Sequence, residues 1–208
     1  MKSENPKTAR TSVNIKELDV RPIELAFVTG LDKENDLFFA QLCKFTNHDL
    51  IEHNKKIHEH CVRLSRDTDG QRPLVEVKPG EVLCTRYKVD NKWYRIIVQT
   101  SDDVKRTCCG YFVDYGTVET MSYEDLMRVR PDELPEIECA PFGIYCKLDT
   151  HDTHDKTVLF NSLQEEYILM RMVERLGADR CIVQLPNCAY NQTFYNTYRA
   201  GGKLILGS

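Results

Sequence analysis

The sequence contains no long hydrophobic run, and this absence narrows the classes of protein that it can encode. No segment of the 208 residues approaches the roughly 18 consecutive apolar residues that a membrane-spanning helix requires. Hydrophobic residues still make up 41% of the chain and charged residues 29%, a balance typical of globular domains. We therefore expect a globular protein with a substantial core and no membrane partner.

A strong excess of one charge is also missing. The formal net charge is −4 and the pI is about 5.9. Non-specific binding of nucleic acid requires clustered Lys and Arg, so this balance disfavours it without excluding a local basic patch. A mildly acidic surface suits a basic, arginine-rich peptide partner better.

The cysteines lack the spacing of a zinc site. None of the nine forms a Cys-x-x-Cys pair, and the adjacent Cys108 and Cys109 would point to opposite faces of a strand. The first 16 residues are polar, so no apolar signal segment precedes the cysteines. We therefore expect reduced thiols in an intracellular protein.

Histidines and carboxylates do not form a recognisable catalytic or metal-binding pattern either. His53 and His60 share one face of a predicted helix but stand two turns apart, and we interpret the helix histidines as a solvated face. The acidic segments 32–36 and 149–155 have no paired arginines beside them to clamp a phosphate. We predict no enzymatic activity, no metal site and no cofactor.

Short apolar runs bounded by turn residues predict a fold that is mainly β with some α. The predicted strands cover residues 23–28, 37–42, 82–87, 93–100, 106–113, 117–121, 127–129, 142–148, 172–176 and 181–185. The predicted helices cover residues 48–64, capped by Thr46 or Asn47, then 156–169 and 193–199, with one helical turn at 122–126.

The strands between residues 82 and 129 are too short for anything but a small, strongly bent barrel. Neither flank is large enough to form a domain alone, so we expect the two flanks to build one lobe around the inserted barrel. The predicted division is a flexible tail at 1–19, the first part of the lobe and a linker helix at 20–75, the barrel at 76–131, and the second part of the lobe at 132–206.

Four aromatic residues are predicted to lie on neighbouring strands and turns of this small barrel: Tyr87, Tyr94, Phe112 and Tyr115. Aromatic rings gathered in this way can enclose a cation, because ring faces carry negative potential and methylated cations are weakly hydrated. The alternative is a purely structural role, in which these rings only fill the barrel core. Trp93 is adjacent to Tyr94, so it should point to the opposite face and serve packing.

One pair of opposite charges is predicted inside the same barrel. Arg95 and Asp114 both lie among apolar strand residues, where an unpaired charge would be costly. A hydrogen-bonded pair between them would fix the strands that carry the aromatic residues. The alternative is two exposed and unrelated charges.

The central segment resembles a Tudor domain. The residues that carry the resemblance are Pro79–Cys84, Trp93–Arg95 and Phe112–Gly116, in this order and at this spacing. The flanks resemble the split staphylococcal-nuclease-like, OB-type lobe of extended Tudor domains in scaffold proteins of the germline piRNA pathway. The resemblance covers about residues 20–206.

The resemblance implies a non-catalytic module that binds methylated arginine in Arg-Gly or Arg-Ala repeats of Argonaute-class (PIWI) partners. It implies symmetric dimethylarginine as the usual ligand and a cytoplasmic, germ-granule location in RNA-mediated silencing. The methylarginine cage carries over onto Tyr87, Tyr94, Phe112 and Tyr115, with Asp114 and Thr117 adjacent to it.

One residue departs from the family pattern. Binding members place Asn directly after the Asp-Tyr-Gly unit, whereas this chain has Thr117, whose hydroxyl is shorter and has a single donor. This departure leaves open a module that binds unmodified peptides or serves dimerisation or assembly. A second alternative is binding of single-stranded RNA by the OB-type lobe, and a third is a reader of methyl-lysine.

Overall fold

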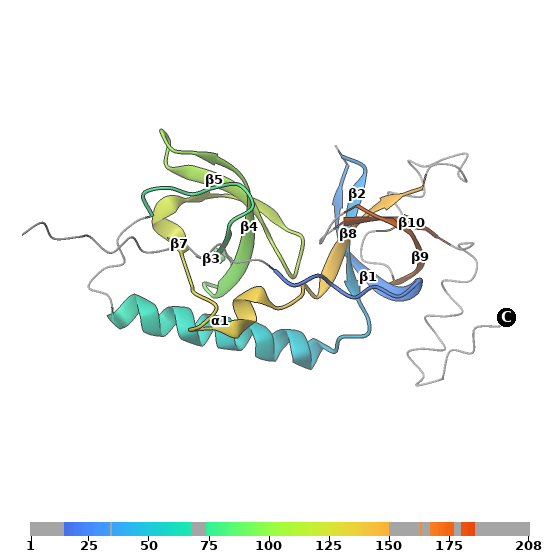
Figure 1. The fold of residues 1–208 in the computed structure, drawn as a ribbon, viewed down its shortest axis with the longest axis horizontal. Helices are drawn as coiled ribbons and strands as arrows, with labels where there is room; N and C mark the ends of the chain where they lie inside the picture. The colour runs from blue at the N-terminus through green and yellow to red at the C-terminus, as the bar shows by residue number, and fades with distance from the viewer. Residues whose placement is uncertain are drawn as a thin grey trace, which may run out of the picture.

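Strands from both ends of the chain form one sheet, and strands from its middle form another. The computed structural model describes residues 15–33, 35–67, 74–149, 163, 167–176 and 180–185. Strands β1, β2, β8, β10 and β9 close into a barrel, hereafter the flanking barrel. Strands β6, β5, β4, β3 and β7 form the central sheet. Figure 1 shows the two sheets side by side, with the helix α1 beneath the central sheet and the flanking barrel beyond one end of that helix.

The flanking barrel comprises β1 (Ile23–Asp32), β2 (Leu37–Leu42), β8 (Gly143–Leu148), β9 (Tyr167–Arg175) and β10 (Arg180–Gln184). Its strands pair antiparallel, except that β10 runs parallel to β8. The core inside the barrel is apolar and includes Phe38, Ile144 and Met170, each at most 1% exposed. Two segments more than a hundred residues apart in sequence therefore share one core.

The central sheet comprises β3 (Val82–Arg86), β4 (Trp93–Asp102), β5 (Thr107–Phe112), β6 (Val118–Ser122) and β7 (Leu126–Met127). The 3-10 turn η1 (Tyr123–Asp125) joins the last two strands, and η2 (Pro135–Glu138) leads out towards β8. All pairings in this sheet are antiparallel. The predicted strands of this segment and the predicted helical turn are confirmed.

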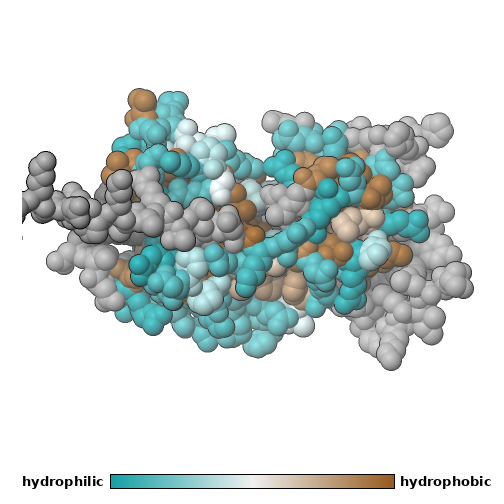
Figure 2. Space-filling model, viewed as in Figure 1, coloured by the Kyte–Doolittle hydropathy of each residue, from teal (hydrophilic) through white to brown (hydrophobic). Residues whose placement is uncertain are grey.

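Helix α1 (Asn47–Asp67) connects the two sheets and packs against the central one. Thr46 caps it, since its hydroxyl accepts from the backbone N–H of Asp49 at 3.1 Å and the Asp49 carboxylate accepts from the Thr46 N–H at 2.8 Å. Ile57 and Cys61 are fully buried against Trp93 and neighbouring residues of the central sheet. The lower edge of Figure 2, which α1 forms, is largely hydrophilic. The predicted helix and its cap are confirmed.

Two expectations were wrong. Residues 167–169 are strand rather than helix, because β9 pairs with both β1 and β10 and buries a continuous run at Ile168, Leu169 and Met170. Periodicity cannot separate such a run from a buried helix segment. The other predicted residues of that helix, apart from Leu163, and the whole helix predicted at 193–199 lie outside the described residues.

The second error concerns the helix histidines. His53 and His60 are only 7% and 8% exposed, so they do not belong to a solvated face. The ring of His53 lies 5.1 Å from that of Phe142, where α1 meets the chain that enters β8.

No helix among the described residues is long and apolar enough to cross a membrane.

Arg95 and Asp114 form a bidentate ion pair in the interior. Arg95 Nε donates to Asp114 Oδ2 at 2.9 Å and Nη2 donates to Oδ1 at 2.8 Å, with both residues at most 2% exposed. Burial alone would raise the pKa of Asp114, but the charge and hydrogen bonds of Arg95 outweigh it and hold this pKa below its ordinary value.

The same guanidinium also holds the segment that leads from the central sheet to the flanking barrel. Arg95 Nη1 donates to the carbonyl of Glu136 at 3.1 Å and to that of Cys139, and Nη2 donates to the carbonyl of Ala140 at 3.0 Å. The backbone N–H of Phe142 donates to Asp114 Oδ1 at 3.3 Å. One buried pair therefore joins β4, the turn after β5 and the entry to β8.

The turn after β5 lies directly against the flanking barrel. Gln41 donates to the Asp114 carbonyl at 2.9 Å, and Tyr145 Oη donates to the Gly116 carbonyl at 2.5 Å. Gly116 has φ +75°, and a Cβ at this position would overlap the ring of Phe39. Only glycine fits this turn without moving the barrel.

We expect Asp114→Ala to destabilise the protein by about 3 kcal/mol or more, because Arg95 would remain buried without a counter-charge. The free energy of unfolding, measured by urea denaturation, checks this. Asp132→Ala is the matched control, since Asp132 pairs with Arg130 at the surface and is 71% exposed. It should cost less than about 1 kcal/mol. Equal stability of Asp114→Ala and the wild type would reject a structural role for the buried pair.

Candidate functional site

The four aromatic residues of the predicted cage come together at one end of the central sheet. Tyr87 follows β3, Tyr94 lies in β4, Phe112 ends β5, and Tyr115 lies in the turn that follows. Ring centroids lie 5.2 Å apart for Tyr87 and Phe112, 6.1 Å for Tyr94 and Phe112, and 5.6 Å for Tyr94 and Tyr115. The ends of neighbouring strands thus place the four rings next to one another at one end of the central sheet.

The rings meet nearly at right angles, with interplanar angles between 72° and 88° for these three pairs. Phe112 is buried, whereas the three tyrosines are only partly buried. The rings therefore contact one another edge to face, and a ring face that no neighbouring ring covers can attract a weakly hydrated cation. Trp93 is 4% exposed and packs with residues of α1 on the opposite face of the sheet.

A carboxylate lies at the edge of this group of rings. Tyr94 Oη donates to Asp90 Oδ2 at 2.6 Å, and Asp90 stands in the turn between β3 and β4. Burial, and then this hydrogen bond, raises the pKa of Tyr94, and burial raises the pKa of Tyr115 to about 12. Both phenols are therefore neutral at physiological pH. The carboxylates near the rings are Asp90, which lies 4.0 Å from Lys92 Nζ, and Asp114, which is paired with Arg95.

An amide from α1 holds the fourth ring. Asn54 is 8% exposed, and its Nδ2 donates to Tyr115 Oη at 2.9 Å. Asn54 Oδ1 has no hydrogen-bond partner among the described residues. Sequence reasoning missed both Asn54 and Asp90. The available signal for Asn54 was its position between Leu50 and Ile57 on the apolar stripe of the helix, where a polar residue needs a partner.

Thr117 lies just outside the rings. Its backbone carbonyl accepts from the Phe112 N–H at 2.9 Å, and its exposed side chain lines the groove between the central sheet and the flanking barrel. Arg95 and Asp114 lie beneath the turn that carries Tyr115. The structure therefore brings together all the predicted site residues, and their role in ligand binding stays a prediction.

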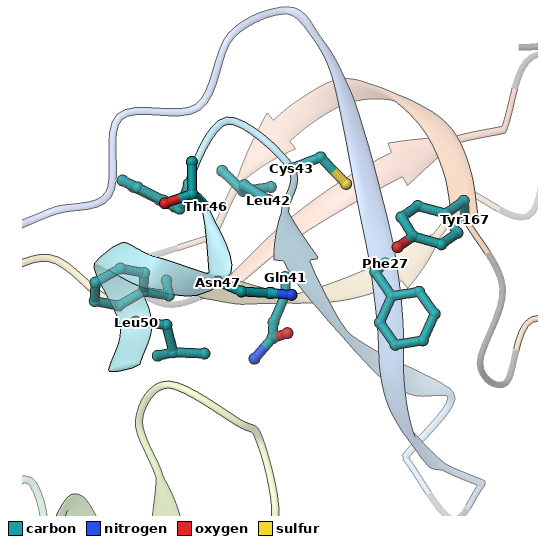
Figure 3. A pocket seen from close by; sticks show the side chains of 10 residues that line it. Phe27, Gln41, Leu42, Cys43, Thr46, Asn47, Leu50 and Tyr167 are labelled. Atoms are coloured by element: carbon teal, nitrogen blue, oxygen red, sulfur yellow. The ribbon is translucent and has the colours of Figure 1, made fainter. Parts of the chain in front are cut away.

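A second concave feature lies on the flanking barrel, beside the start of α1. Figure 3 shows Phe27 and Tyr167 close together on one side of this pocket and Gln41 near its centre. The pocket has a volume of about 350 Å³. Two ring pairs, Phe27 with Tyr167 at 4.8 Å and Phe45 with Phe142 at 4.9 Å, contribute to its wall. Sequence reasoning did not single it out.

Among the described residues, no three His, Cys, Asp or Glu side chains converge as metal ligands would. The groups that the site offers are the four aromatic rings, the tyrosine hydroxyl groups, the Asn54 amide and the nearby Asp90 carboxylate. Such a set of groups can hold an organic cation by ring faces and charge.

Comparison of the chain with known proteins identifies the family to which it belongs. The Tudor domain family model matches residues 26–150. Mouse Tudor domain-containing protein 1 is 26% identical over 162 residues, which are 76% of this chain and 13% of the relative. The zebrafish protein of the same name is 31% identical over 123 residues, which are 59% of this chain and 10% of the relative. The chain spans only about a tenth of the length of these relatives.

Solved structures show the same fold. The human TDRD1 extended Tudor domain, in complex with a symmetrically dimethylated peptide, matches with a TM-score of 0.63 at 20% identity, covering 92% of this chain and 94% of that one. Mouse TDRD1 domain TD3, in complex with a MILI peptide containing dimethylarginine, matches at 0.61 and 20% identity, covering 95% and 100%. The predicted fold class, mainly β with a helix and of the extended Tudor type, is confirmed: a closed five-stranded barrel and a second five-stranded sheet match these structures.

The scaffold beneath the rings should give the protein a pH-dependent stability. His53 Nε2 lies 3.7 Å from Asp114 Oδ2, and burial lowers the pKa of His53 from 6.5 to about 4. Between these two pH values the unfolded chain binds a proton that the folded protein does not. The free energy of unfolding should therefore fall as pH drops from 6.5 to 4, by roughly 3 kcal/mol for this residue.

Urea denaturation of His53→Gln across the same pH range checks this expectation. The variant should lose most of the slope, whereas His48→Gln, which changes an exposed histidine of the same helix, should keep it. An unaltered slope in His53→Gln would show that the histidine does not remain neutral in the folded protein.

Proposed function

Because the chain belongs to the Tudor domain family, we propose that its four-ring site binds a methylated arginine in a peptide of a partner protein. The observation that carries the proposal is the set of four rings at mutual angles near 90°, with the Asp90 carboxylate beside them. Ring faces attract the methylated guanidinium, and the carboxylate adds long-range attraction. The peptide complexes of the human and mouse structural relatives support this choice of ligand.

The proposed ligand is symmetric dimethylarginine in an arginine-rich segment of an Argonaute or PIWI-type protein. The protein would then act as a non-catalytic scaffold of small-RNA silencing in cytoplasmic, germ-granule bodies. The relatives named Tudor domain-containing protein 1 support this setting by family membership alone. We assign the Tudor module to residues 76–131, the first part of the staphylococcal-nuclease-like lobe and the linker helix to residues 20–75, and the second part of the lobe to residues 132–206.

A single ring site should bind weakly. Each cation–π contact contributes roughly 0.5–2 kcal/mol, so the remaining affinity must come from contacts along the groove between the central sheet and the flanking barrel. Several linked modules would raise the effective affinity further. The matched residues make up only 13% and 10% of the two relatives, which leaves room for such repetition.

Thr117 favours one alternative function. The residue offers a hydroxyl where binding members of the family have an amide, so the site would lose a hydrogen bond to the guanidinium. A module that binds peptides regardless of methylation, or that serves assembly, would tolerate this change.

Calorimetric titration with an Arg-Gly repeat peptide in unmodified, asymmetric and symmetric dimethyl forms separates the two functions. The symmetric form should bind most tightly, and Tyr115→Ala should weaken that binding about tenfold, because one ring face is lost. Tyr167→Ala is the matched control, since Tyr167 is a partly buried tyrosine in a ring pair outside the site. Equal affinity for all three peptides would reject the methylarginine site and favour the alternative.

A further inference from the structure

A groove between the central sheet and the flanking barrel lies next to the ring site. It has a volume of about 1060 Å³. Gly116, Thr117 and Val118 of the central sheet form one side, directly after the turn that carries Tyr115. Tyr145 also lines the groove, and its hydroxyl donates to the Gly116 carbonyl at 2.5 Å, which joins the two sides. We call this feature the inter-lobe groove.

Three cationic side chains line the inter-lobe groove: Lys33, Lys147 and Arg180. They come from three parts of the flanking barrel, namely the turn after β1, strand β8 and strand β10. All three are exposed. Within the part of the chain that the structure describes, none of them forms an ion pair.

Among the described residues that line the inter-lobe groove, Asp32 supplies the one carboxylate. Its oxygens already accept hydrogen bonds from the backbone N–H of Asn35 at 3.2 Å and from Asn35 Nδ2 at 2.8 Å. The described lining residues, three cations and one carboxylate, therefore carry a net positive charge in a chain whose formal net charge is −4. Charges of one sign around a concave surface raise the local concentration of ligands of the opposite sign.

The lining favours a peptide over a nucleic acid. The two aromatic residues among the described lining residues, Phe39 and Tyr145, are only 2% and 5% exposed, so they offer no ring face for a base to stack on. Exposed apolar side chains are present instead, since Val118 is 46% and Leu176 is 51% exposed. Three cations beside small apolar surfaces match a peptide that alternates acidic and apolar residues.

We propose that the inter-lobe groove binds an acidic stretch of the same peptide that places its methylarginine among the four rings. Thr117 supports this continuity, because it lies two residues after Tyr115 and its side chain lines the groove. The partner peptide would then carry opposite charges in two neighbouring parts, a guanidinium for the rings and carboxylates for the groove. The inference deepens the proposed function and rests on it for the position of the methylarginine.

Fluorescence polarisation with four labelled peptides tests this inference. All four have the same Arg-Gly centre, flanked on both sides by glutamates or by glutamines, and each is made with and without symmetric dimethylation. At low ionic strength the methylated glutamate peptide should bind about fivefold more tightly than its glutamine counterpart. This advantage should shrink as salt is added, because the groove charges are exposed.

The variant Lys147→Gln/Arg180→Gln should lose the advantage of the glutamate peptide while keeping the wild-type affinity for the methylated glutamine peptide. Lys55→Gln/Lys105→Gln is the matched control, because it removes two exposed lysines outside the groove, 56% and 78% exposed, and should keep the advantage. Equal binding of glutamate and glutamine peptides by the wild type would overturn the inference. An advantage that persists in the groove variant would overturn it as well.

The peptide set also separates this inference from the proposed function. A glutamate advantage that depends on Lys147 and Arg180 but not on methylation would support the acidic-peptide groove and overturn the methylarginine site. Discrimination by methylation without any glutamate advantage would do the reverse. Tighter binding of a labelled oligouridylate than of the glutamate peptides, lost in the groove variant, would overturn the inference in favour of RNA.

Discussion

The buried ion pair between Arg95 and Asp114 joins the parts of the molecule that must keep a fixed relation for the site to exist. Arg95 lies in β4 beside Tyr94, and Asp114 lies beside Tyr115, so the pair connects two of the four ring-bearing segments. The same guanidinium donates to backbone carbonyls of the segment that leads into the flanking barrel. Because both charges are almost fully buried, neither can leave the pair without a large cost in desolvation.

This constraint explains why the binding features lie at the junction of the two sheets. The turn that Asp114 anchors presents Tyr115 on one side, where Asn54 of α1 holds the hydroxyl at 2.9 Å. On the other side it presents Thr117 to the inter-lobe groove. Gly116 allows the turn to lie against Phe39, since any side chain there would clash with the ring. The turn is thus held by hydrogen bonds on both sides, and a site that is already positioned before binding has a lower entropy cost of ordering.

Most of the fold was predictable from the sequence, because local patterns carry it. The alternation of apolar residues and the turn residues predicted the strands of the central sheet, and the aromatic spacing predicted that Tyr87, Tyr94, Phe112 and Tyr115 would meet. The predictions from sequence were wrong where contacts between distant segments determine the secondary structure or the burial of a residue. Residues 167–169 are strand because β9 pairs with β1 and β10, and His53 is buried against Phe142 and Asp114, which come from distant segments. The contact of Asn54 with Tyr115 joins residues 61 apart. Lys33, Lys147 and Arg180 line one groove because β2 pairs with β8 and β8 pairs with β10, which no local pattern reveals.

The central claim is that a turn held by Arg95 and Asp114 presents four rings that enclose a methylated guanidinium. The most direct measurement is proton NMR of an Arg-Gly peptide whose dimethylarginine methyl groups carry ¹³C, observed during titration with the protein. Methyl groups among ring faces experience ring currents, so their proton resonances should move upfield as the complex forms. The shift should shrink in Tyr87→Leu, which removes one ring. Methyl resonances that stay in place while the peptide's amide resonances change would contradict the account, because the peptide would then bind without entering the rings.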